Sequence, residues 1–128
     1  MFRSFVRSVA AALLAAASLA HAQGYPAKTI RLICPFPPGG AVDIASRSIA
    51  AELSKTMGQS VIVENKPGAG GNIGGAEAAR SAPDGYTIFM TTSGINAINP
   101  ALYAKMPFDP NKDLVPVSAL VIAMSALA

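Results

Sequence analysis

The 128-residue sequence has no tryptophan, one histidine and one cysteine. His21 lies in a segment that we expect to be removed on export, which leaves a mature chain without histidine. These absences exclude Ser-His-Asp catalysis, Cys-His catalysis and histidine-based zinc sites for this chain, and we expect no metal and no cofactor. A single cysteine, Cys34, cannot form a disulfide within the chain. It lies in an apolar run, and we interpret it as a small buried hydrophobic residue.

The first 22 residues have the pattern of a cleaved export signal. Arg3 and Arg7 provide a basic start, residues 9–20 are almost continuously apolar, and residues 20–22 (AHA) match the small-residue cleavage pattern. The apolar run is shorter than the roughly 20 residues that span a bilayer, which disfavours a membrane anchor. We therefore predict a signal peptide at residues 1–22, a periplasmic mature protein, and no direct membrane insertion after cleavage.

The charge balance is small, with ten Lys+Arg, seven Asp+Glu and a formal net charge of +3. Arg3 and Arg7 leave with the signal, so the mature chain is close to neutral. It has neither the basic stripe nor the basic and aromatic platform that nucleic-acid-binding proteins use. No nucleic-acid partner is therefore expected.

Short β-branched runs alternate with stretches of helical spacing along the mature chain. Strands are predicted at residues 29–34, 60–64 and 86–91, and helices at residues 45–57 and 72–81. Gly58 is expected to end the first helix. One helical turn is predicted at residues 99–103 and a last strand at residues 115–124. This β-α-β-α-β order predicts an α/β fold with a doubly wound, mostly parallel sheet.

Two glycine-rich turns, residues 35–40 (PFPPGG) and 66–71 (KPGAGG), each follow a predicted strand and precede a predicted helix. A third, polar turn at residues 92–96 follows the third strand. Right-handed crossovers place all strand-to-helix turns of such a sheet at its carboxyl edge. Free backbone N–H groups at the start of a helix bind anions, and glycine lets the backbone approach a ligand. We therefore expect the three turns to converge on one anion-binding crevice.

Several side chains near these turns have two interpretations. Asp43 either orders the first turn, which we favour, or contacts a ligand. Phe36 either covers the carbon skeleton of a ligand or packs in the core. Lys66 either adds positive charge to the crevice or is a solvated loop lysine, which we favour. The N–H groups of residues 69–72 form a run able to make an anion-binding concavity, and Thr92, Ser93 and Asn96 can hydrogen-bond to a carboxylate.

Nucleotide binding and hydrolysis are weaker alternatives. Residues 68–73 (GAGGNI) have the first two glycines of the dinucleotide fingerprint but isoleucine at the last place, and no acid follows about 20 residues later. An exported hydrolase built on Ser93 lacks an evident base, and Ser93 is not in a G-x-S-x-G elbow. We therefore predict that the protein is not an enzyme.

Four motifs in order resemble the Bug-type extracytoplasmic substrate-binding proteins, the receptors of tripartite tricarboxylate transporters. They are residues 35–43 (PFPPGGAVD), 45–47 (ASR), 63–71 (VENKPGAGG) and 83–87 (PDGYT), and the resemblance covers essentially all of the mature chain. It implies the first lobe of a type II periplasmic binding protein, which closes with a second lobe on a small carboxylate. The ligand-binding residues that it implies here are Phe36, Pro38, Gly39, Gly40, Asp43, Gly68, Ala69, Gly70, Gly71 and Ser93.

Members of that family continue into a second lobe, whereas this sequence ends in the apolar residues 121–128. We therefore interpret it as truncated near the first hinge strand, with residues 23–128 as the first lobe. The predicted function is periplasmic capture of a di- or tricarboxylate-like ligand, with membrane transporter subunits as partners. A ligand-presenting partner of a sensor kinase is the alternative that the same lobe allows.

Overall fold

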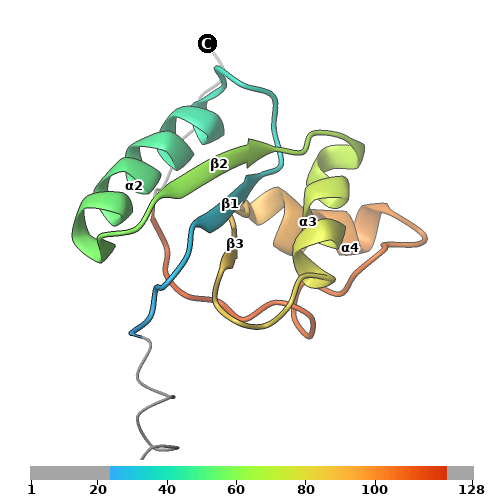
Figure 1. The fold of residues 1–128 in the computed structure, drawn as a ribbon. Coiled ribbons are helices and arrows are strands. Elements are labelled where there is room, and N and C mark those ends of the chain that lie inside the picture. The colour runs from blue at the N-terminus through green and yellow to red at the C-terminus, as the bar shows by residue number, and fades with distance from the viewer. Residues whose placement is uncertain (1–23, 121–128) are drawn as a thin grey trace, which may run out of the picture.

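The structure is a computed structural model that describes residues 24–120 (Figure 1). The predicted signal peptide and residues 121–124 of the predicted last strand lie outside these residues. Within residues 24–120, no helix is both long and apolar enough to cross a membrane.

Three parallel strands form the central sheet. They are β1 (Ile30–Cys34), β2 (Val61–Asn65) and β3 (Thr87–Phe89), in the spatial order β2-β1-β3. In the register, Cys34 lies opposite Asn65 and Ile33 lies opposite Phe89. The carboxyl ends of all three strands are therefore neighbours at one edge of the sheet.

Helices cover both faces of this sheet. The long helix α2 (Ala41–Met57) connects β1 to β2, and α3 (Asn72–Ala79), preceded by the short η1 (Ala69–Gly71), connects β2 to β3. The π-helical turn η2 (Gly94–Ile98) and α4 (Asn99–Leu102) follow β3. Figure 1 shows α2 on one side of the sheet and α3 with α4 on the other. The predicted doubly wound, parallel α/β fold is confirmed.

The core lies around β1 and beneath α3. Because helices cover both faces of the central strand, β1 is apolar on both sides, and Arg31 is the one residue of the strand that is not buried. Cys34 is fully buried and unpaired, as the sequence predicted. On the α3 side, Ala76, Ile95 and Phe108 form a buried cluster. The ring of Phe108 occupies the space that a Cβ on Gly75 would need, so α3 approaches this ring through a residue without a side chain.

The strand prediction for residues 115–124 is wrong for the part that the structure describes. Residues 114–120 form no strand, and the side chains of Val115 and Val117 are 86% and 89% exposed. Pro116 lies between them and has no N–H to donate to a sheet. The predicted helix end is confirmed, because Gly58 caps α2 in the left-handed conformation at φ 68° and donates its N–H to the Ser54 carbonyl.

Candidate functional site

The candidate site is the sheet edge at which the three strands end. The Lys66 N–H donates to the Cys34 carbonyl at 2.8 Å, and the Met90 N–H donates to the Ile33 carbonyl at 2.9 Å. These bonds continue the β1–β2 and β1–β3 ladders to the last two residues of the central strand. The turns after β1, β2 and β3 therefore start side by side, as the topology of the predicted sheet requires.

A buried carboxylate holds the first turn in place. The Asp43 side chain is 3% exposed and accepts three hydrogen bonds, from Arg47 Nε at 2.9 Å, Asn65 Nδ2 at 2.8 Å and the Gly39 N–H at 2.9 Å. Asn65 Nδ2 also donates to the Phe36 carbonyl at 2.9 Å. Asp43 at the start of α2 thus holds the Gly39 end of the turn, and Asn65 at the end of β2 holds the Phe36 end. These are the contacts of a residue that orders the loop, the role we favoured for Asp43.

The same contacts keep Asp43 ionised. Its hydrogen bonds to Arg47, to Asn65 and to the Gly39 N–H hold the pKa of the carboxyl well below its usual range. The interaction with Asp43 in turn raises the pKa of the Arg47 guanidinium. A carboxylate whose oxygens already accept three hydrogen bonds has little capacity left for a ligand, and its charge would repel an anion.

Gly40 provides the free donor of the first turn. It is the N-cap residue of α2, with φ −78° and ψ 165°, and no side chain caps the helix there. No acceptor for the Gly40 N–H is present among the described residues. The first N–H groups of a helix have no partner within the helix, and the helix dipole makes this end positive. The first turn therefore presents backbone donors beside the end of β1.

The second turn offers fewer donors than the sequence predicted. The Gly71 N–H donates to the Gly68 carbonyl at 2.9 Å, and the Asn72 N–H donates to the Ala69 carbonyl. Two of the four predicted N–H groups are therefore used inside the turn. In the described part of the chain the N–H groups of Ala69 and Gly70 have no acceptor, and both residues are left-handed, at φ 49° and 62°.

Helix α4, which follows the third turn, is tied to the second turn by a side chain that sequence analysis did not identify. Asn99, at the start of α4, donates through Nδ2 to the Gly70 carbonyl at 3.0 Å and to Asn72 Oδ1 at 2.8 Å. Asn99 and Asn72 are both buried. In the sequence Asn99 is indistinguishable from an ordinary residue before proline, so nothing marked it as a link between turns.

Among the third-turn candidates, Ser93 remains available and two others are engaged. Ser93 is exposed, and no partner for its hydroxyl is present among the described residues. Thr91 Oγ1 donates to Asn96 Oδ1 at 2.7 Å, and Thr92 Oγ1 accepts from the Ile95 N–H at 3.4 Å. Phe36 is half-buried and packs against the cluster of Ala76, Ile95 and Phe108, which favours its interpretation as a core aromatic.

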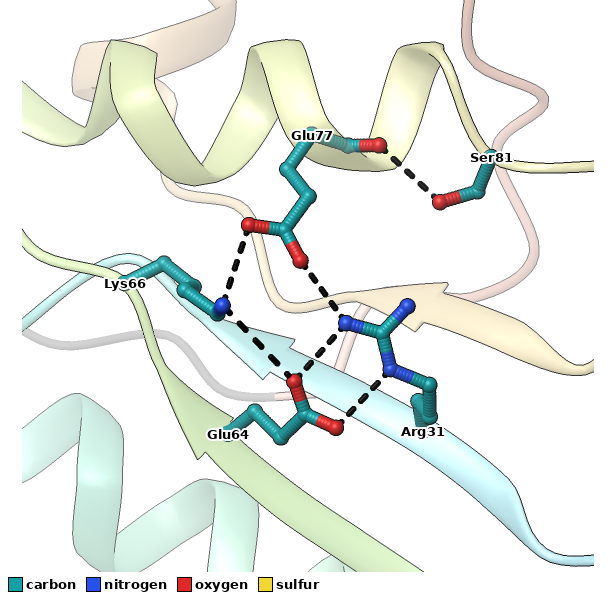
Figure 2. Close-up of polar contacts among 5 residues, drawn as sticks. All are labelled: Arg31, Glu64, Lys66, Glu77 and Ser81. Atoms are coloured by element: carbon teal, nitrogen blue, oxygen red, sulfur yellow. Dashed lines mark hydrogen bonds and ion pairs between the residues drawn. The ribbon is translucent and has the colours of Figure 1, made fainter.

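Lys66 belongs to an ion-pair network, so its interpretation as a solvated loop lysine is wrong. Its Nζ lies 3.2 Å from Glu77 Oε2 and 4.0 Å from Glu64 Oε2. Arg31 donates to both oxygens of Glu64 at 2.8 Å and to Glu77 Oε1 at 2.7 Å. Figure 2 shows these two cations and two carboxylates converging between the sheet and α3.

The two positive charges of this network are balanced by its two carboxylates, so it provides no net positive charge for an anionic ligand. Hydrogen bonds from Arg31 lower the pKa of Glu64 and of Glu77, so both carboxylates are ionised and balance the two cations. It connects β1, β2 and α3, and it holds Lys66, the first residue of the second turn. We found no cluster of three or more metal-binding side chains within residues 24–120.

Comparison with known proteins identifies relatives of this chain. The sequence profile of the tripartite tricarboxylate transporter family receptors (TctC) matches residues 45–128. Protein BugT of Bordetella pertussis is 45% identical over 98 residues, which cover 76% of this chain and 30% of BugT.

Solved structures agree with this match. MatC from Rhodopseudomonas palustris, with bound malate, is 38% identical with a TM-score of 0.72, over 75% of this chain and 33% of MatC. An R. palustris protein with adipate is 40% identical with a TM-score of 0.67, over 69% of this chain and 29% of that protein. The chain thus spans about a third of the length of these relatives.

Proposed function

Because this chain belongs to the tripartite tricarboxylate transporter receptor family, we propose that it is the first lobe of a periplasmic receptor for a small carboxylate. The receptor would pass a di- or tricarboxylate to membrane transporter subunits. Two relatives support the ligand class, because one structure contains malate and another contains adipate.

One observation supports this proposal most strongly. Backbone donors from the first and second turns, at Gly40, Ala69 and Gly70, lie at the shared carboxyl edge without an acceptor in the described part of the chain. A carboxylate has two oxygens that accept about four hydrogen bonds, and such charge-assisted bonds are the strong ones.

We assign two kinds of role to the ten candidate residues. Direct donors are the N–H groups of Gly40, Ala69 and Gly70, together with the Ser93 hydroxyl. The other six give the turns their shape, and they are Phe36, Pro38, Gly39, Asp43, Gly68 and Gly71.

The hydrogen-bond energies available at this sheet edge indicate that tight binding of a carboxylate requires contacts from a second surface. Three or four hydrogen bonds to a carboxylate, at about 1.5 to 3 kcal/mol each, give roughly 5 to 12 kcal/mol, while association costs about 4 to 15 kcal/mol. Micromolar affinity requires about −8 kcal/mol. A second lobe that closes over the ligand would supply the missing contacts and exclude water.

The test is equilibrium dialysis of the protein produced from its complete reading frame. Malate, adipate and citrate are compared with their neutral amides, which keep the carbon skeleton and remove the charge. We expect micromolar binding of at least one carboxylate and binding of its amide at least ~100-fold weaker, because two or more charge-assisted bonds are lost. Equal binding of acid and amide, or no binding of any carboxylate, would contradict the proposal.

A further inference from the structure

A groove lies beside the second turn and shares one residue, Ala69, with the proposed carboxylate site. Its volume is about 340 Å³, and it separates α3 from the segment that follows α4. The lining residues that matter here are Ile73, Ala76 and Arg80 of α3, and Tyr103, Lys105 and Pro107 of the later segment. Neither aspartate nor glutamate lines it.

The groove contains the unbalanced positive charge of this part of the chain. Six basic residues have a carboxylate within 4.0 Å, namely Lys28, Arg31, Arg47, Lys55, Lys66 and Lys112. Arg80 and Lys105 have no carboxylate partner among residues 24–120, and both line the groove. Arg80 and Lys105 thus differ from the six paired basic residues, and both line the same groove.

The walls between these cations are apolar. Ile73 is 53% exposed although it is a large hydrophobic residue, and Ala76 and Pro107 continue the same surface. A partner that fits this groove carries carboxylates at positions that reach Arg80 and Lys105, with apolar side chains between them. Charge complementarity of this kind accelerates association and selects the partner.

We propose that this groove docks an acidic segment of the membrane transporter subunits, an inference that rests on the proposed function. A small anion fits it less well, because Arg80 and Lys105 are both exposed and a solvated ion pair contributes only about 0–1 kcal/mol. Small-molecule sites instead bury roughly 70–90% of their ligand. An anionic membrane surface is attracted by clusters of about 4–8 basic residues, and the groove has two.

The groove adjoins the ligand-binding edge. Ala69 of the second turn lines it, and a Cβ on Gly70 would lie 3.0 Å from the Tyr103 hydroxyl. A protein segment seated between Arg80 and Lys105 therefore lies next to the turn from which the carboxylate must be released. A transporter subunit docked in the groove would contact the receptor next to its ligand.

The test separates docking from ligand binding. The variant Arg80→Glu/Lys105→Glu is made in the protein from its complete reading frame. Its Kd for malate or adipate, whichever the parent binds, is measured by dialysis. Uptake of the same radiolabelled acid is measured in cells that carry the membrane subunits and lack the native receptor. We expect a Kd within about threefold of the parent and an uptake rate at least ~10-fold lower, because a reversed charge repels the acidic partner.

The matched control is Lys55→Glu/Lys112→Glu, which makes the same change in net charge at side chains that are 71% and 82% exposed and do not line the groove. We expect its uptake to equal that of the parent. Thermal unfolding of both variants and of the neutral Arg80→Gln/Lys105→Gln variant checks that the fold is intact, and the neutral variant should show an intermediate loss of uptake.

Four results would overturn the proposal. Normal uptake by the groove variant would show that nothing acidic docks there. An equal loss in both charge-reversed variants would indicate general attraction to the membrane surface. A Kd raised more than ~10-fold in the groove variant would assign the groove to the carboxylate site. If the parent binds no carboxylate at all, the proposed function fails and the docking inference fails with it.

Discussion

At the scale of single residues, Asp43 does most to define the site. It is an ionised carboxylate, 3% exposed, with donors from the first turn, from α2 and from the end of β2. Sequence analysis favoured an ordering role because an acid in the first turn of a helix stabilises that end. The sequence did not predict Asn65 as its partner, because the two residues are 22 positions apart and meet only through the β1–β2 pairing.

Asp43→Asn should lower the free energy of unfolding by about 1 to 3 kcal/mol. The amide keeps the shape, but it replaces a charged acceptor and turns an N–H₂ group toward one of three donors. Urea denaturation measures the effect. Glu52→Gln serves as the control, since Glu52 pairs with Lys55 in the same helix but is 72% exposed, and it should change stability by less than about 0.5 kcal/mol. Equal stability of the two variants would contradict the role assigned to Asp43.

Stability should also depend on pH through this carboxyl. Folding lowers the pKa of Asp43 from its ordinary value of 3.8. The unfolded chain therefore takes up a proton first as the pH falls, so the stabilisation is complete well above pH 4 and is lost progressively below it. Urea denaturation between pH 3 and pH 7 should show a steeper loss for the parent than for Asp43→Asn. Parallel curves would show that Asp43 titrates alike in the folded and unfolded chains.

At the scale of elements, the sequence predicted those that have a strong apolar pattern. The three strands, α2 and α3 were predicted to within four residues of their ends, because β-branched runs and four-residue spacing are local signals. The π-helical η2 was expected as a turn, since residues 92–96 are polar and carry no helical spacing. The strand predicted at residues 115–124 is absent from its described part, residues 115–120, where Pro116 lacks the N–H that a sheet needs and the apolar side chains of Val115 and Val117 are exposed.

The packing of α3 also depends on contacts that no local pattern contains. Inside a helix, alanine is more favourable than glycine by roughly 1 kcal/mol. Gly75→Ala should nevertheless destabilise the protein by about 1 to 3 kcal/mol, because the new methyl group overlaps the buried Phe108 ring. Gly94→Ala is the matched control, since a Cβ there meets nothing closer than Thr92 Oγ1 at 3.6 Å. Chemical denaturation measures the free energy of unfolding of both variants. A Gly75→Ala protein as stable as the parent would show that the Phe108 ring can move aside.

At the scale of the whole molecule, the arrangement of the site followed from topology alone. Parallel strands joined by right-handed crossovers bring their following turns to one edge, and the strand register confirms that they meet there. The bonds between the turns could not be predicted. Asn65 reaches Asp43 and Phe36, and Asn99 reaches Gly70, across separations of 22 to 29 residues. Lys66 was likewise misjudged, because its partner Glu77 comes from α3.

We propose that unpaired backbone N–H groups of the converging turns bind the carboxylate, and Gly40 offers a way to remove one of these groups. Its φ of −78° is close to the value that proline requires, and a Cβ there meets only the Pro37 carbonyl at an ordinary 3.7 Å. Gly40→Ala therefore adds a side chain and keeps the N–H, whereas Gly40→Pro removes the N–H.

The decisive measurement is the Kd of both variants for the carboxylate that the parent binds, with thermal unfolding to verify that each variant is folded. We expect Gly40→Ala to bind the carboxylate within about threefold of the parent. We expect Gly40→Pro to bind it roughly 10- to 150-fold more weakly, because one charge-assisted bond of about 1.5 to 3 kcal/mol is lost. If a folded Gly40→Pro protein binds as tightly as Gly40→Ala, the Gly40 N–H does not bind the ligand.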